Sequence, residues 1–185
     1  RTLQTPQDEE EVRRYRASHL FEDILSDRTS LFLRYRVRQR DFSNGGMAST
    51  HVRRALLRLG ATLETARRCA IAVYEAEMNL VIHTTNGGIL RVEIQPELIF
   101  IEALDDGPGI EDIDRAMQPG YTTTPPEIHA MGFGAGFGLV NIQRFVDKMW
   151  LKSQPGEGTR LEMWIYLQPE AERRRLETLL DRLST

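Results

Sequence analysis

The sequence contains a single cysteine, Cys69, and its only lysines are Lys148 and Lys152, although it has 24 basic residues. One cysteine cannot form a disulfide within the chain, which favours a reducing, cytoplasmic compartment. No run of about 18 apolar residues occurs, so no membrane-spanning helix is expected. No secretory leader is evident. The net charge of −3 argues against a chain built to coat nucleic acid or an anionic membrane.

The composition is that of a globular protein, with 185 residues, of which 41% are hydrophobic and 28% charged. We expect one domain over residues 31–167, a helical extension over residues 1–30 and a C-terminal helix over residues 168–185. Each of the two extensions carries an apolar stripe. We expect both to cover the sheet, with a dimer or partner contact as the alternative.

Hydrophobic periodicity predicts the secondary structure between these extensions. Helices are expected over residues 47–59, 62–84 and 111–117 and after Gly138, and strands over residues 31–40, 89–94, 98–105, 150–153 and 159–167. Arginines alternate along the first strand and predict a solvated face, with a partner surface as the alternative. Residues 118–138 show no periodicity and are expected to form a lid or binding loop. The helix after Gly138 is expected to place Leu139, Ile142, Val146 and Met149 on one side.

Three polar residues, Glu75, Asn79 and His83, recur at i, i+4 and i+8 in the long central helix and therefore share one face. Such a row is a poor core face, because buried polar groups must find partners. Two interpretations remain open for the helix taken alone. The row is either a solvated helix face or a site for a metal-bound phosphate and an attacking hydroxyl.

Two glycine-containing segments follow. Asp105-Asp-Gly-Pro-Gly109 ends a buried strand, where a carboxylate can accept a hydrogen bond from an exocyclic amine such as that of adenine, but it is also a common turn. The second segment, Gly132-x-Gly-x-Gly-x-Gly138, leads into the start of a helix. It predicts either a cradle of backbone N–H groups for phosphate or a flexible hinge. It is not a Walker loop, because no Gly-Lys-Ser/Thr follows, and the long loop before it differs from a Rossmann turn.

Taken in order with Gly156-Glu-Gly-Thr159, these motifs resemble the ATP-binding domain of the GHKL superfamily, shared by DNA gyrase, histidine kinases, a heat-shock chaperone and the MutL-type repair proteins. The resemblance covers residues 31–167. Residues 73–83, 112–123 and 136–139 are similar to the anti-sigma and stress-switch serine/threonine kinases of bacteria. The implied fold is the Bergerat fold, an α/β two-layer sandwich whose mixed, mostly antiparallel sheet carries helices on one face.

The resemblance implies an enzyme, a protein serine/threonine kinase that uses ATP and Mg²⁺. By the same resemblance, Glu75 is the general base, Asn79 the Mg²⁺ ligand and Asp105 the residue that reads adenine, supported by Thr159. The remaining nucleotide-binding residues that it implies are His83, Gly107, Gly109, Gly132, Gly134, Gly136 and Gly138. The lid departs from many related kinases, because His129 is its one basic residue, and Arg144 and Lys148 lie further along the chain.

The implied substrate is a small antagonist protein of the STAS type in a partner-switching pathway, with a sigma factor or a phosphatase as further partners and a homodimer as a compatible state. Two alternatives stay open. One is an ATP-responsive binding module that sequesters a sigma factor or activates a phosphatase with little catalysis. The other is a detached histidine-kinase catalytic domain. A sensor histidine kinase also needs a dimerising helical hairpin with a phospho-accepting histidine, and no second helix of such a hairpin follows His19.

Overall fold

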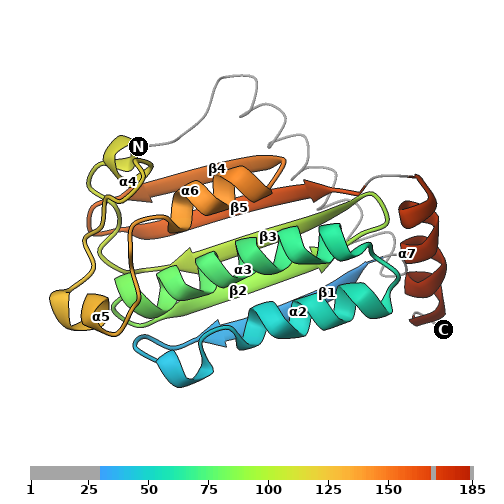
Figure 1. Ribbon diagram of the computed structural model, residues 1–185, viewed down its shortest axis with the longest axis horizontal. Coiled ribbons are helices and arrows are strands. Elements are labelled where there is room, and N and C mark those ends of the chain that lie inside the picture. The colour runs from blue at the N-terminus through green and yellow to red at the C-terminus, as the bar shows by residue number, and fades with distance from the viewer. Residues whose placement is uncertain (1–29, 168–169, 184–185) are drawn as a thin grey trace.

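The computed structural model describes residues 30–167 and 170–183, so residues 1–29 of the expected helical extension lie outside the described residues. Five strands form an open sheet in the order β1-β2-β3-β5-β4 (Figure 1). They are β1 (Leu31–Val37), β2 (Gly88–Ile94), β3 (Leu98–Asp105), β4 (Lys148–Gln154) and β5 (Gly158–Tyr166). All four pairings of these strands are antiparallel, whereas the sequence predicts a mixed, mostly antiparallel sheet.

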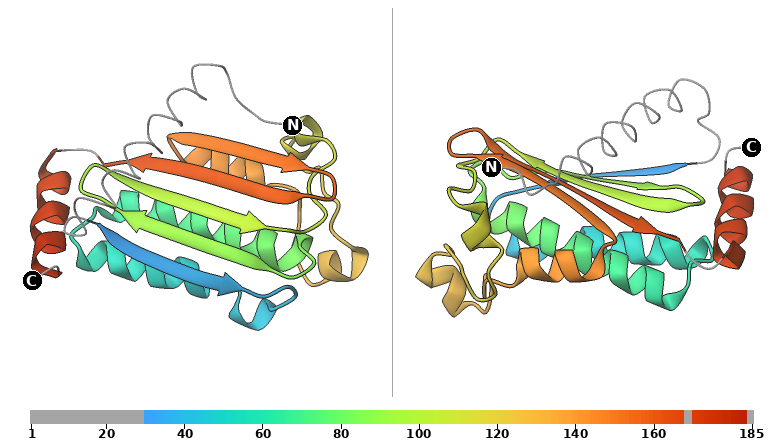
Figure 2. Two further views of the ribbon diagram at one scale, coloured as in Figure 1. Left: turned by 180° about the vertical axis from the view of Figure 1, so that it is seen from behind. Right: turned by 90° about the horizontal axis from the view of Figure 1, so that it is seen from above.

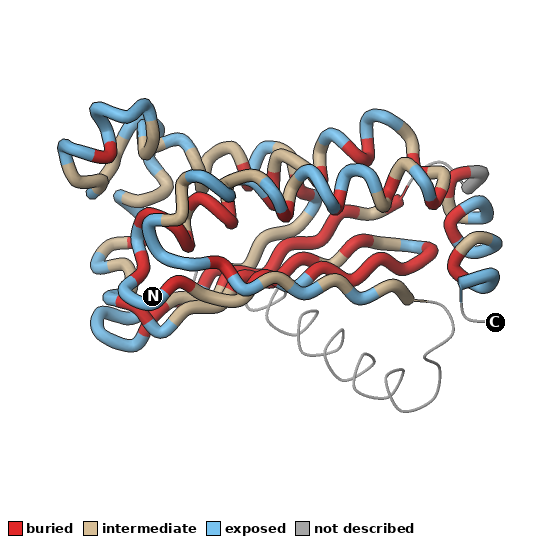
Figure 3. Tube along the Cα trace, turned by 90° about the horizontal axis from the view of Figure 1, so that it is seen from below, coloured by how far each residue is buried: buried red, intermediate tan, exposed pale blue. Residues whose placement is uncertain are grey.

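Three helices cover one face of this sheet: α2 (Met47–Arg58), α3 (Leu63–His83) and α6 (Gly138–Phe145) (Figure 2). The predicted two-layer α/β sandwich is therefore confirmed. The core lies between the layers, where buried residues follow both the strands and the inner sides of the helices (Figure 3). Val92, Ile101 and Met163 are paired side by side across three strands and are all buried. Each such side chain contributes roughly 1.5–3 kcal/mol of transfer free energy.

Helix α3 begins and ends as the sequence predicts. The Thr62 side chain accepts a hydrogen bond from Thr65 N at 3.1 Å and caps the first turn. The helix ends at His83, and Gly87 follows with φ of 73°. A Cβ at Gly87 would lie 2.0 Å from Val37 O, so only glycine lets β1 approach the end of α3 this closely.

The end of α6 differs from the prediction. Its helix stops at Phe145, Val146 is extended with φ −98° and ψ 157°, and Met149 belongs to β4. Leu139 and Ile142 do lie on this helix, but Val146 and Met149 do not. The apolar spacing continues from the helix into the next strand without a glycine or proline between them, so periodicity alone places the boundary too late.

The lid is more regular than predicted. The helix expected just before the lid, over residues 111–117, is present as α4 (Ile113–Ala116), and the lid itself contains the short helix α5 (Pro126–Ala130), within the stretch that shows no periodicity. Pro126 occupies the beginning of α5, where the missing N–H of proline costs nothing. Ile128 anchors this helix in the core, and the Phe133 ring lies 4.9 Å from that of Phe42, in the 3-10 helix η1 (Phe42–Asn44).

Helix α7 (Glu170–Leu183) stands at the end of the molecule opposite the lid (Figures 1 and 2). Leu176 and Leu180 are buried, and Glu172 Oε1 accepts a hydrogen bond from Thr62 N at 2.6 Å. The helix therefore packs beside the connection between α2 and α3 rather than across the sheet, where the sequence analysis expects it. No helix within the described ranges has the length and apolarity needed to cross a membrane.

Candidate functional site

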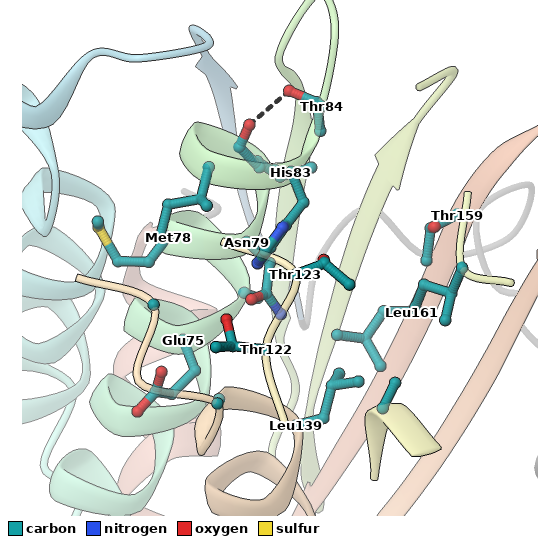
Figure 4. Close-up of a pocket in the computed structure, with 18 of the residues that line it drawn as sticks. Glu75, Met78, Asn79, His83, Thr84, Thr122, Thr123, Leu139, Thr159 and Leu161 are labelled. Carbon is teal, nitrogen blue, oxygen red and sulfur yellow. Dashed lines mark hydrogen bonds between the residues drawn. The ribbon is translucent and has the colours of Figure 1, made fainter. Parts of the chain in front are cut away.

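A cleft of about 730 Å³ opens at the lid end of the molecule. Its walls are the second half of α3, the end of β3, the beginning of β5, the lid and the start of α6 (Figure 4). Every residue to which the sequence resemblance assigned a role in catalysis or in nucleotide or metal binding lines it except Gly107. The lining residues among them are Glu75, Asn79, His83, Asp105, Gly109, Gly132, Gly134, Gly136, Gly138 and Thr159.

The polar row of α3 lines the cleft, and Figure 4 shows Glu75, Asn79 and His83 following one another along this helix. The opposite stripe of the helix is buried in the core, so this face is the one left for the cavity. A Cβ at Gly138 would lie 3.3 Å from both Asn79 Oδ1 and Glu75 Oε2, so the first turn of α6 begins directly beside the two oxygens. Although His83 is partly exposed in the cleft, the surrounding protein desolvates its ring and lowers its pKa, which favours the neutral imidazole.

Asp105 lies at the last position of β3, with its carboxyl group held by the following turn. Gly107 N donates a hydrogen bond to Asp105 Oδ1 at 2.8 Å, so Gly107 supports the carboxylate from outside the cleft lining. Burial raises the pKa of Asp105, and the charge of Asp106 raises it further, while the backbone N–H groups of Gly107 and Thr159 oppose the shift. The partly desolvated carboxylate of Asp105 can therefore accept a hydrogen bond from a donor group on a flat ring bound in the cleft.

The turn after Asp105 is tied to the hairpin between β4 and β5. Ser153 Oγ lies 2.8 Å from Thr159 Oγ1 and accepts a hydrogen bond from Ile110 N at 2.8 Å. A Cβ at Gly109, where φ is 74°, would lie 2.1 Å from Gln154 O. Glycine is therefore required for this contact, and Ser153 is a supporting residue that no sequence motif indicated. Ala103, Leu151 and Leu161 add apolar lining below, as expected for a slot that takes a flat base.

The glycine run of the lid packs against the segment before it. A Cβ at Gly134 would lie 2.0 Å from Thr124 Oγ1, and one at Gly136 would lie 2.5 Å from Tyr121 O. Gly120 N also donates a hydrogen bond to Gly136 O at 3.0 Å. The lid thus forms a closely packed double segment over the cleft, with the N-terminus of α6 at its base. Helix N-termini of this kind offer backbone N–H groups to phosphate oxygens.

The basic residues considered for the phosphates do not line the cleft: His129, Arg144 and Lys148 are all outside its lining. Arg115 approaches the edge of the cleft, because its guanidinium lies 4.8 Å from the centroid of the ring of Tyr121, a lining residue. No sequence motif marks Arg115 or Asn141. Asn141 Nδ2 donates a hydrogen bond to Glu75 Oε1 at 2.8 Å, a contact between residues 66 positions apart that sequence spacing cannot indicate.

The cleft suits a magnesium ion held mainly by a nucleotide. Among the described residues, no group of three or more histidine, cysteine or acidic side chains could hold a metal ion. Mg²⁺ in nucleotide sites usually keeps water and phosphate ligands and takes few protein ligands. The single amide oxygen Asn79 Oδ1, beside the start of α6, fits that pattern.

Known proteins resemble this chain in sequence and in fold. The profile of the histidine kinase-, DNA gyrase B-, and HSP90-like ATPases matches residues 64–170. The anti-sigma F factor of Caldanaerobacter subterraneus subsp. tengcongensis is 36% identical over 128 residues, which are 67% of this chain and 86% of that protein. The anti-sigma F factor of Thermoanaerobacter pseudethanolicus is 37% identical over the same shares of both chains.

A solved structure supports the fold. The RsbU and RsbW domains of a Mycobacterium tuberculosis protein match with a TM-score of 0.51 and 14% identity, over 75% of this chain and 33% of that one. With the profile match, these findings show that the chain belongs to the family of histidine kinase-, DNA gyrase B- and HSP90-like ATPases. Within that family the sequence relatives place it in the anti-sigma kinase type, and the resemblance found in the sequence is confirmed.

Proposed function

We propose that this chain is an ATP-dependent protein serine/threonine kinase that phosphorylates a small STAS-domain antagonist protein in a partner-switching pathway. The observation that carries the proposal is the position of Glu75. Glu75 lines the cleft of an ATPase-family fold, and its Oε2 lies beside Gly138, the first residue of α6, which also adjoins Asn79 Oδ1. A base in this position, next to the expected phosphates, can accept a proton from an attacking hydroxyl.

The proposal gives separate roles to Asp105, Asn79, Glu75 and the glycines of the lid. Asp105 accepts a hydrogen bond from the adenine amine, Asn79 Oδ1 would ligate Mg²⁺, and the glycine N–H groups of the lid and α6 hold the phosphates. Bound ATP with Mg²⁺ supplies the phosphoryl group and neutralises the charge that develops during transfer. Glu75 takes the hydroxyl proton of the protein substrate. Catalysis then consists of positioning and electrostatic stabilisation in a site that the lid shields from water.

The main rival is an ATP-responsive binding module that sequesters a sigma factor or activates a phosphatase with little catalysis. Both functions require ATP binding, so the nucleotide cleft does not separate them. They differ at Glu75, because a binding module needs no base beside the phosphates. The half-buried carboxylate, hydrogen-bonded and directed into the cleft, favours the kinase. A histidine-kinase catalytic domain would instead produce phosphohistidine, which acid hydrolyses.

The test is phosphotransfer from labelled ATP, with Mg²⁺, to purified STAS-domain proteins encoded in the same genome. We expect an acid-stable phosphoprotein with the parent chain. Glu75→Ala should lower the transfer rate by about 10²–10⁴ while the dissociation constant for ATP stays within about twofold, since a base contributes to chemistry rather than to binding. Glu64→Ala, an exposed change on the same helix, is the control. Unchanged transfer by Glu75→Ala would remove Glu75 from the mechanism, and an acid-labile product would favour a histidine kinase.

A further inference from the structure

The side chain of Glu75 is held by a residue of another helix. Asn141, in the first half of α6, donates from Nδ2 to Glu75 Oε1 at 2.8 Å. A carboxylate oxygen only accepts hydrogen bonds, so the amide must present its NH₂ group to Glu75. Both side chains are partly exposed in the cleft, and both line it. The contact thus joins the lid-side helix directly to the proposed base.

The hydrogen bond leaves the two oxygens of Glu75 in different surroundings. Oε1 is engaged by Asn141, whereas Oε2 lies beside Gly138 at the start of α6, where the phosphates are expected. A glutamate has three side-chain torsions and samples several rotamers on an open helix face. Fixing one oxygen selects the rotamer in which the other faces the reacting groups. A positioned base is more effective than a mobile one, because its orientation is settled before the reaction.

We propose that Asn141 is a positioning residue for phosphoryl transfer, which holds the Glu75 carboxylate so that Oε2 receives the proton of the substrate hydroxyl. The inference rests on the proposed kinase function. In the step, the hydroxyl oxygen bonds to the γ-phosphorus, the bond from that phosphorus to the bridging oxygen of ADP breaks, and the hydroxyl proton passes to Glu75 Oε2. Asn141 touches neither substrate and acts only through Glu75.

A purely structural role makes different predictions. If the hydrogen bond only fastened α6 to α3, its loss would lower stability and loosen the phosphate cradle, so the affinity for ATP would fall. If Asn141 positions Glu75, its loss lowers kcat and leaves both the affinity for ATP and the KM for the protein substrate near the parent values. The split between kcat and binding therefore separates the two roles.

The experiment compares the parent with Asn141→Leu, which keeps the size but removes the donor, and Asn141→Asp, which replaces the donor with a like charge. The assay is transfer from labelled ATP to the STAS-domain protein that the parent phosphorylates. We expect Asn141→Leu to lower kcat about tenfold to a hundredfold, the effect of losing one hydrogen bond to a charged group. Asn141→Asp should lower kcat at least as much, because its carboxylate repels Glu75. Gln143→Leu, an exposed amide on the same helix, should keep the parent kcat.

A measurement without turnover tests the contact itself. The side-chain amide resonances of Asn141, assigned by their absence in Asn141→Leu, should shift in Glu75→Gln, whereas those of Asn44, bonded to Asp41, should not. Parent-like kcat in both Asn141 variants, or an Asn141 amide that does not respond to Glu75→Gln, would overturn the inference while the kinase function stands. A parent chain that transfers no phosphate would overturn the kinase function, and the positioning role with it.

Discussion

Asp105 shows how a binding residue can lower the stability of the protein that carries it. Burial raises the pKa of its carboxyl group above the ordinary value of 3.8. Above that raised pKa the folded protein holds a charge that the unfolded chain solvates better, so the residue destabilises the fold at neutral pH. Below 3.8 the group is protonated in both states, and the effect disappears.

Asp105→Asn should therefore increase the free energy of unfolding at pH 7, because the neutral amide removes a partly desolvated charge and can still accept the bond from Gly107 N. The gain should shrink as the pH is lowered toward 3.8. Urea denaturation of both proteins across this range measures it. A variant less stable than the parent at pH 7 would mean that the hydrogen bonds to the charged carboxylate outweigh its desolvation.

Some residues of the site can be recognised from local sequence patterns, and others only from the folded structure. Glu75, Asn79 and His83 share a helix face through spacing alone, and Asp105 stands at a strand end next to glycines, so their location in one cleft was predictable. Asn141 and Ser153 act through hydrogen bonds to Glu75 and Ile110, residues far away in sequence. No local pattern marks them, and only tertiary packing reveals them.

At the scale of elements, Glu77 on α3 stabilises the beginning of α2. The N-cap of α2 is Gly46, which supplies no side-chain hydrogen bond. Instead the buried Glu77 accepts from Ala48 N at 3.3 Å and from Ser49 N at 3.4 Å. Burial raises the pKa of Glu77, and these backbone N–H groups oppose the shift. A carboxylate at a helix N-terminus also interacts favourably with the helix dipole.

Glu77→Ala should lower the free energy of unfolding by about 1–3 kcal/mol, because it leaves buried N–H groups of α2 without an acceptor. The exposed Glu64, which forms only a surface ion pair with Arg67, offers the matched control. Glu64→Ala should change stability by less than about 1 kcal/mol. Equal effects of the two substitutions in urea denaturation would contradict the assignment of Glu77 as the cap of α2.

The helices and strands were predictable where the local sequence patterns for them were strong. β3 spans the predicted residues 98–105, and α3 begins at its predicted threonine cap. The prediction failed for the end of α6, where apolar periodicity continues into β4, and for α5, which lies in a stretch without periodicity and begins at Pro126. In both places, packing against the core decided between structures that the local sequence allows.

At the scale of the whole molecule, the lid helix α5 and helix α7 lie at opposite ends of the sandwich (Figure 1), and the lid lines the cleft. The division into an ATP-binding domain over residues 31–167 and an appended helix over residues 168–185 stays a prediction. The burial of Leu176 and Leu180 shows that this helix packs on the described domain. We therefore expect α7 to contribute to stability without contributing to nucleotide binding.

Leu176→Ala should lower the free energy of unfolding by about 2–5 kcal/mol, because it opens a cavity under α7. Leu183→Ala, on the same helix but 66% exposed, should change it by about 0.5 kcal/mol at most. Neither variant should alter the affinity for ATP while it is folded. Weaker ATP binding by folded Leu176→Ala would show that α7 is coupled to the cleft.

The central claim is that the cleft binds ATP through Asp105, and isothermal titration calorimetry with ATP and Mg²⁺ tests it most directly. The parent chain should bind, and Asp105→Asn should bind at least about tenfold more weakly, the effect of losing a hydrogen bond to a charged acceptor. Circular dichroism establishes that both proteins are folded. Absence of binding by the folded parent, or equal affinities of the two proteins, would contradict the account.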